Sequence, residues 1–435
     1  MQGLYEAVST LCLVLFFMSK HHTGKSVAGN SLAAVIELLV RCNDEYALPK
    51  IFEQELGSLV HNLLFIISRR RCSFDFLLKQ YCRKKIRPLL RQVFWWALAE
   101  WFFLDALSAG SIVNIAVDHV KQQCSQREAG FVNAVLRQLL KLPRDSSYLR
   151  HFSQVPQHVE LELPPELYTH LQQSLSAEEL HRCAMLWLQP APVFLRRLPG
   201  AEAAIPPGLK RLPPFSWAPH CEMYLYQFEE GASLSQVLAL PGLYYAQDPS
   251  TLLAPAMLAV KPGETVADLC AAPGGKALLL AEALDGRGNL YCRDRSDSRL
   301  DLLRQNLQSH TNVEIAACDA QQPDLPEASL DAILLDLPCS NTGVIRRRPD
   351  LRWTFNRRKL QELIEMQAVI CQQSLKLLKP GGRLVYSTCS VDKNENEAQV
   401  ASILQSNSGL MLIKEQRLLP DTYNDGAYAA LLQKK

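Results

Sequence analysis

The sequence predicts a multi-domain protein with an all-helical first part, a small α/β connector domain and a final α/β domain around a mostly parallel sheet. These parts are expected at residues 1–144, 145–236 and 237–435. Apolar residues keep helical spacing from about Gly29 to Leu142, and Pro143 with the polar string RDSS ends that pattern. After Gly242, short apolar runs alternate with helical segments, which implies right-handed crossovers within a parallel sheet.

Each part shows its own pattern. In the helical part, AGFVNAVLRQLLK places apolar side chains on one helical face, at Val132, Val135, Leu136, Leu139 and Leu140. Ser111 is the expected N-cap of the preceding helix, IVNIAVDHVKQQC. The connector contains two amphipathic segments, PELYTHLQQSL and AEELHRCAMLWL. The strands of the last part are expected at ETVADLC, GNLYCRD, NVEIAACDA, LDAILLDLP and GGRLVYSTC.

Composition narrows the class of protein. With 435 residues, 48% hydrophobic and 21% charged, the chain is typical of globular proteins, which excludes disordered and fibrous classes. The net charge of +2 does not by itself indicate a nucleic-acid partner. Thirteen cysteines without a CxxC pair predict free thiols in a reducing cytoplasm and no metal. The apolar run Leu11–Met18 fits neither a signal peptide nor a membrane span, and residues 1–17 are either a helix or extra sequence before a start at Met18.

Carboxylate and thiol side chains, which can bind a ligand or take part in catalysis, lie where the predicted strands end. These residues are Asp268, Cys270, Asp294, Asp319, Asp336, Cys339 and Cys389. In a doubly wound sheet, ligands bind beyond the carboxyl ends of the strands, so these side chains should face one crevice. The loop DLCAAPGGK has Gly274 and Gly275 for close approach of a ligand, but it lacks the residues of a phosphate loop and the GxGxxG of a dehydrogenase.

The acidic residues after the second and third strands indicate the ligand of that loop. Asp294 is suited to ribose hydroxyls and Asp319 to an adenine amino group. A lone glycine pair is usually only a tight turn, and a single acidic residue at a strand end is usually a cap. The combination predicts an adenosine-bearing cofactor without a phosphate chain.

These strings resemble the RNA cytosine-5 methyltransferases of the RsmB (Fmu/Sun) type. The similarity is carried by DLCAAPGGK, DLPCSNTGVIRRRPDLRW, LLKPGGRLVYSTCS with ENE, YYAQDPSTLLA and LLPDTYNDGAYAALLQK, while SIVNIAVDHVK with AGFVNAVLRQLLK is similar to a NusB-like domain. The resemblance implies a Rossmann-like fold, S-adenosylmethionine as methyl donor and 16S ribosomal RNA as substrate. It assigns cofactor binding to Cys270, Ala271, Ala272, Pro273, Gly274, Gly275, Lys276, Asp294, Asp319 and Asp336. Departures from the family pattern are Ala277, Asn341 and Arg348.

Two cysteines suit the chemistry that the resemblance implies. Cytosine C5 becomes nucleophilic enough to accept a methyl group only after a thiolate adds at C6. The RNA family uses the cysteine of TCS, which assigns attack to Cys389 and leaves elimination to Cys339. DNA cytosine methyltransferases use a Pro-Cys motif instead, which would favour Cys339. Asp336 is expected to border both the methyl donor and the cytosine edge, and the common alternative for either thiol is a buried small hydrophobe.

Two clusters of basic residues are candidate RNA contacts. The first runs from Arg69 to Arg91, and the second, RRRPDLRW through NRRK, has Trp353 and Phe355 interleaved for base stacking. A charge run is often only a solvated face, and the similarity to NusB favours RNA binding here. We expect a monomer without membrane contact. The alternatives are the same reaction on transfer RNA and a non-catalytic RNA-binding assembly factor.

Overall fold

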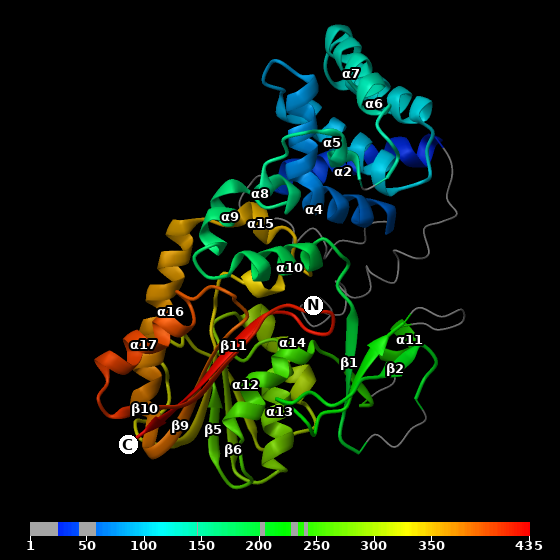
Figure 1. Ribbon diagram of the computed structural model, residues 1–435. Coiled ribbons are helices and arrows are strands. Elements are labelled where there is room, and N and C mark those ends of the chain that lie inside the picture. Colours follow the sequence, from blue (N-terminus) through cyan, green and yellow to red (C-terminus); the bar gives the residue numbers. More distant parts are fainter. Residues whose placement is uncertain (1–24, 43–57, 146, 201–204, 228–233, 239–241) are drawn as a thin grey trace.

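The computed structural model describes residues 25–42, 58–145, 147–200, 205–227, 234–238 and 242–435. Figure 1 shows a helical domain at one end, a layered α/β domain at the other, and the connector elements between and beside them. This arrangement confirms the predicted fold class. In the described part of the chain, no helix is long and apolar enough to cross a membrane, and no cluster of three metal-ligating side chains is present.

The helical domain packs five described helices around one core. They are α2 (Lys25–Cys42), α4 (Ser58–Tyr81), α5 (Pro88–Phe103), α6 (Ala109–Gln123) and α7 (Gln126–Leu139). The predicted apolar face of α7 is buried, with Val132, Leu136 and Leu139 fully enclosed. The predicted cap of α6 is wrong by one turn: Ser108 is the N-cap, and its hydroxyl accepts the backbone N–H of Ser111, so the helix begins at Ala109.

The connector consists of short helices and a small antiparallel sheet. Its helices are α8 (Gln157–Glu160), α9 (Pro165–Leu171) and α10 (Ala177–Trp187), and the last two share a core with Ile345 and Val391 of the last domain. The sheet has the order β2 (Leu209–Arg211), β3 (Met223–Tyr226), β1 (Val193–Arg197), β4 (Tyr244–Ala246). The small sheet therefore includes residues beyond the predicted boundary at 236.

The last domain is a seven-stranded sheet with the order β10-β11-β9-β8-β5-β6-β7. Its strands are β5 (Thr265–Asp268), β6 (Asn289–Asp294), β7 (Val313–Ala317), β8 (Leu330–Asp336), β9 (Leu378–Thr388), β10 (Leu410–Leu418) and β11 (Ala427–Lys434). Strands β5 to β9 are parallel, whereas β11 runs antiparallel to both of its neighbours, β9 and β10. The strand order reverses between β5 and β8, which is where such sheets bind ligands.

Helices cover both faces of this sheet, because its strands are apolar on both sides. Adjacent residues of β5, Val266 and Ala267, enter separate cores on opposite faces. One face is covered by α12 (Leu253–Leu258), α13 (Gly275–Leu284) and α14 (Asp297–Leu307), and the other by α16 (Arg357–Leu377) and α17 (Glu397–Ser406). The result is a three-layer domain whose crevice lies at the strand ends.

Part of the predicted RNA-contact surface lies instead in the junction between the helical domain and the last domain. The buried Arg352 donates to the carbonyl oxygens of Arg69 (3.0 Å) and Trp187 (2.9 Å), and the Trp353 indole donates to Ser68 O (2.8 Å). Another partly buried ring, that of Phe355, packs at 5.0 Å from the imidazole of the connector residue His170.

The structure therefore corrects the expectation for these residues. Buried arginines whose donors are used by main-chain carbonyls, and rings engaged in packing, are not available to grip RNA. The cations of the first cluster that remain exposed are Lys79, Arg83, Lys84, Lys85 and Arg87.

Candidate active site

Strand pairing brings the two candidate cysteines together. In the parallel pair β8–β9, Asp336 lies opposite Ser387, so Cys339 and Cys389 follow a short distance beyond the same edge. Their Sγ atoms are 3.4 Å apart, close enough for one thiol to donate to the other. The prediction that two neighbouring strand ends place these cysteines at one crevice agrees with this geometry.

The two thiols have different surroundings. Cys339 is buried. Its hydrogen bond with Cys389 raises its pKa well above the usual range, and burial adds to this shift. Cys389 is half-buried and contributes to the wall of a pocket. Cys339 therefore keeps its proton, and its S–H can donate to the sulfur of Cys389.

Short polar residues after each cysteine hold the two loops together. Ser340 and Ser390 have their hydroxyls 3.2 Å apart, and the Thr342 hydroxyl lies 2.9 Å from that of Ser390. Main-chain bonds add to this link, because Gly343 N–H donates to Cys389 O at 3.0 Å. A side chain at Gly343 would meet main-chain atoms of Gly426 and Cys389 at 2.6 to 2.7 Å, so only glycine permits this approach.

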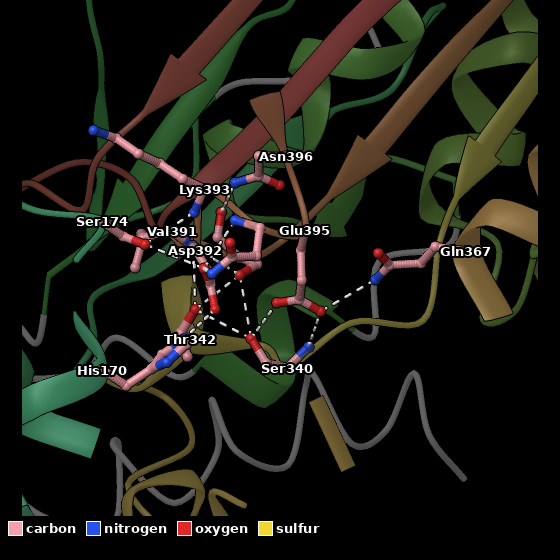
Figure 2. A network of polar contacts seen from close by, with 12 residues as sticks. His170, Ser174, Ser340, Thr342, Gln367, Val391, Asp392, Lys393, Glu395 and Asn396 are labelled. Carbon is pink, nitrogen blue, oxygen red and sulfur yellow. Dashed lines mark hydrogen bonds and ion pairs between the residues drawn. The ribbon is translucent and has the colours of Figure 1, made fainter. Parts of the chain in front are cut away.

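Glu395 is the centre of the buried network in Figure 2. Its Oε1 accepts the backbone N–H of Ser340 at 2.8 Å and the side-chain amide of Gln367 at 3.1 Å. Gln367 also donates to Pro338 O at 2.9 Å, so both residues hold the Cys339 loop. Burial raises the pKa of Glu395, while its hydrogen bonds oppose that shift.

The loop that follows Cys389 is anchored to the connector through Asp392. This fully buried carboxylate accepts from the ring of His170 in α9 and from the Ser174 hydroxyl at 3.1 Å. Lys393 N–H donates in turn to Ser174 at 3.0 Å, and Figure 2 shows both connector residues directed at Asp392. Although burial opposes it, the combined hydrogen bonds lower the pKa of Asp392, so the anchor is an ionised one.

The loop after β5 forms a pocket of about 60 Å³. It is lined by Gln247, Thr251, Asp268, Cys270, Ala271, Ala272, Pro273, Gly275, Lys276 and Asp336. Asp268 is fully buried at its base, and its Oδ2 has no hydrogen-bond partner among the described residues. Burial and the neighbouring Asp336 raise the pKa of Asp268 to about 8. An orphan carboxylate oxygen inside a pocket fits a cationic ligand group.

The other predicted cofactor residues lie around this loop. Asp294, at the end of β6, accepts the N–H of Ala272 at 3.1 Å and of Ser296 at 3.0 Å, which ties the loop to the strand. Lys276 forms an ion pair with Asp336 at 2.7 Å. Asp319 follows β7 and is half-buried, with Oδ1 accepting Gln321 N–H at 2.9 Å.

A second pocket, of about 90 Å³, adjoins Cys389. It is lined by Phe194, Ala246, Gln247, Asp248, Ser250, Thr251, Val344, Arg347, Cys389 and Asp425. Gln247 and Thr251 belong to both pockets, so the cofactor loop and Cys389 face adjoining spaces. Arg347 bridges Asp248 at 2.7 Å and Asp425, which places a buried charged cluster beside the thiol.

Several of these residues were missed by reasoning from the sequence. Asp248, Arg347 and Asp425 come from segments far apart in the chain, so spacing alone could not associate them. Glu395 was noticed only as part of the string ENE, and Asn341 only as a departure from a family pattern. Asp268, in contrast, was already named among the residues at the predicted strand ends.

Comparisons with known proteins identify relatives of both the helical and the α/β domain. Residues 255–432 match the family described as 16S rRNA methyltransferase RsmB/F, and residues 14–141 match the NusB family. The probable ribosomal RNA small subunit methyltransferase B of Synechocystis sp. is 29% identical over 373 residues, covering 79% of each chain. The ribosomal RNA small subunit methyltransferase B of Xanthomonas campestris is 29% identical over 375 residues, covering 82% of each chain.

Solved structures share the fold. The structure of PH0851 superposes with a TM-score of 0.72 at 21% identity, covering 93% of this chain and 99% of its own. A methyltransferase homolog protein from Pyrococcus horikoshii gives a TM-score of 0.55 at 26% identity, covering 64% of this chain and 97% of its own. The matched regions therefore place a NusB-family domain before a domain that matches the 16S rRNA methyltransferase RsmB/F family, whose members depend on S-adenosylmethionine, in the order that the fold shows.

Proposed function

We propose that this protein transfers a methyl group to C5 of a cytosine in small-subunit ribosomal RNA, through a covalent bond between Cys389 and C6 of the base. The observation that carries the proposal is the pair of thiols 3.4 Å apart at the ends of two neighbouring strands. One group can attack while the other handles a proton, which is what covalent catalysis on a pyrimidine requires.

The pocket at the loop after β5 fits S-adenosylmethionine. Asp268 would hold the ammonium group of the methionine part, because its buried oxygen lacks a partner. Asp294 would accept from ribose hydroxyls, and Asp319 would face the adenine. When bound, this cofactor supplies a methyl group activated by a sulfonium. Gly275 lines this pocket and packs against Tyr245, since a Cβ at this position would meet the Tyr245 ring at 3.2 Å.

Different side chains of the protein are assigned to the successive steps of the reaction. The Cys389 thiolate would add to C6, and C5 of the resulting enamine would then accept the methyl group, whose bond to the sulfonium breaks to leave a neutral thioether. Cys339 would give its proton to the departing Cys389 sulfur and take the C5 proton in its place, so that the C5–C6 double bond forms again as the bond to Cys389 breaks. Cys339 is assigned to that release, since its S–H lies beside the leaving sulfur. Asp336 lines the cofactor pocket, and its ion pair with Lys276 links the end of β8 to the loop after β5.

The pocket beside Cys389 is the proposed place of the target cytosine. Carboxylates of Asp248 and Asp425 can accept from an exocyclic amino group, and Arg347 holds both in place. A base in a duplex cannot reach this depth, so the target must be unpaired or flipped. The exposed cations between α4 and α5, from Lys79 to Arg87, are the proposed contact with the RNA backbone.

The direct test is a map of 5-methylcytosine by bisulfite sequencing in total RNA from cells with and without the gene. We expect one or more cytosines of small-subunit ribosomal RNA to lose the modification and to regain it with the wild-type protein, but not with Cys389→Ala. Loss confined to transfer RNA would reassign the substrate. An unchanged map would favour a non-catalytic role in assembly.

A further inference from the structure

Asn341 lies between the two cysteines in the chain and in space. Its backbone has a φ of 57°, a left-handed conformation that asparagine tolerates better than most residues. Its Nδ2 donates to Cys339 O at 2.9 Å. Because a carbonyl oxygen can only accept, this bond fixes which end of the amide is nitrogen and turns Oδ1 toward the thiols.

That oxygen is in contact with the proposed nucleophile. Asn341 Oδ1 lies 2.9 Å from Cys389 Sγ and 4.0 Å from Cys339 Sγ. An amide oxygen accepts a hydrogen bond but does not take up a proton at ordinary pH, so it stabilises the thiol and disfavours the thiolate. The S–H of Cys339 has the opposite effect, because it can donate to a thiolate at Cys389. These two contacts therefore act in opposite directions on the charge of one sulfur. The other charged groups that share its pocket are Asp248 and Asp425, which are bridged by Arg347 and are left unchanged in the variants below.

We propose that Asn341 is a positioning residue whose amide oxygen accepts the S–H of Cys389 and so opposes its ionisation in the RNA-free protein. Its amide is anchored by the main chain of the Cys339 loop, so the contact is built into the same turn that sets the distance between the thiols. The inference deepens the proposed function, since it concerns the thiol to which attack is assigned. It can be tested without RNA or cofactor.

The test is the pH dependence of alkylation of Cys389 by iodoacetamide in the full chain. Trypsin releases this residue as LVYSTCSVDK, residues 384–393, which contains no other cysteine, so mass spectrometry reports on Cys389 alone. Asn341→Gly removes the amide and suits a positive φ. Asn341→Asp keeps the size and tolerates the backbone while placing a negative charge near the sulfur. The fully buried Cys371 serves as an unreactive reference for intact folding.

We expect Asn341→Gly to move the midpoint of the pH–rate profile down by about half to one pH unit, as expected for loss of one hydrogen bond to the thiol. Asn341→Asp should move the midpoint upward. Asn341→Ser, which also removes the amide oxygen, should follow the glycine variant and replaces it if that variant is unstable. An unchanged midpoint in the glycine or serine variant, or shifts of the same sign in the glycine and aspartate variants, would overturn the inference. Neither outcome bears on whether RNA is methylated, so the proposed function stands or falls separately.

Discussion

Cys339 and Cys389 occupy equivalent places beyond two neighbouring parallel strands, yet their surroundings differ. Cys339 is only 7% exposed and has a raised pKa, whereas Cys389 lines a pocket. Strand pairing accounts for their proximity, and the loops that follow account for their difference. A Pro-Cys motif and a TCS motif are therefore distinguished by burial and partners rather than by position in the sheet.

The largest effect should come from breaking the link between the two loops. Glu395→Ala leaves the buried N–H of Ser340 without its acceptor, at about 1 to 3 kcal/mol, and removes one of the two acceptors of the Gln367 amide. Methylation should fall about a hundredfold, since Cys339 is no longer held beside the reacting sulfur. An RNA-linked protein band on denaturing gels should persist, because release is slowed.

The matched variant is Glu395→Gln, which keeps one acceptor oxygen and should lie between Glu395→Ala and the wild type. Thermal unfolding must show that both variants are folded. Full activity in a folded Glu395→Ala protein would mean that other contacts hold the loops.

A second prediction separates the cofactor pocket from the thiols. The pKa of Asp268 is raised to about 8, so below that pH its carboxyl group is mostly protonated in the free protein. Binding a cationic group favours the carboxylate and releases the proton. Affinity for S-adenosylmethionine should therefore rise from pH 6 to pH 8, by up to about tenfold per pH unit.

Calorimetry across this range measures the effect. Asp268→Asn should flatten the profile, while Cys389→Ala should leave its slope unchanged, because the thiols do not contact the cofactor pocket. A wild-type affinity independent of pH would remove Asp268 from the role of cation partner.

A third, smaller effect is expected at Asp294. Asp294→Ala removes a proposed ribose contact and two loop hydrogen bonds, and it should raise the dissociation constant for S-adenosylmethionine by about tenfold. The exposed Asp297, in the first turn of α14, offers a matched control, and Asp297→Ala should bind normally. Equal affinities of the two variants would assign Asp294 to structure alone.

The smallest effect concerns RNA binding far from the thiols. Replacing Lys84 and Lys85 by alanine should weaken RNA binding severalfold at low salt and reduce the slope of log affinity against log salt by about one to two. Lys414→Ala, an exposed position on β10, is the control. A salt dependence that stays the same in the double variant would place the RNA contact elsewhere.

Much of the fold followed from local patterns. The helical spacing of α7 and the alternation of strands with helices both predict elements that the structure contains, because these patterns depend on which face is buried. Ser108 shows where such reasoning stops, since it and Ser111 are both plausible caps and only the hydrogen bond decides. The final strands β10 and β11 were not predicted, because they join the sheet in antiparallel fashion after the alternation ends.

The site was predictable where it depends on strand ends and unpredictable where it depends on tertiary contacts. Strand-end placement brought Cys339 and Cys389 into one crevice. Within the second basic string, Arg352 and Trp353 were misassigned to RNA, because sequence does not distinguish a solvated side chain from one buried against main-chain carbonyls. The partnership of Arg347 with Asp248 and Asp425 likewise exists only in the folded chain.

The most direct measurement of the central claim is denaturing electrophoresis of Cys339→Ala and Cys389→Ala after incubation with labelled RNA and S-adenosylmethionine. Cys339→Ala should form the bond to C6 and fail to release it, giving a persistent RNA-linked band, whereas Cys389→Ala should give no band and no methylation. A band with Cys389→Ala and none with Cys339→Ala would reverse the two roles. Full activity in both variants would contradict covalent catalysis by these thiols.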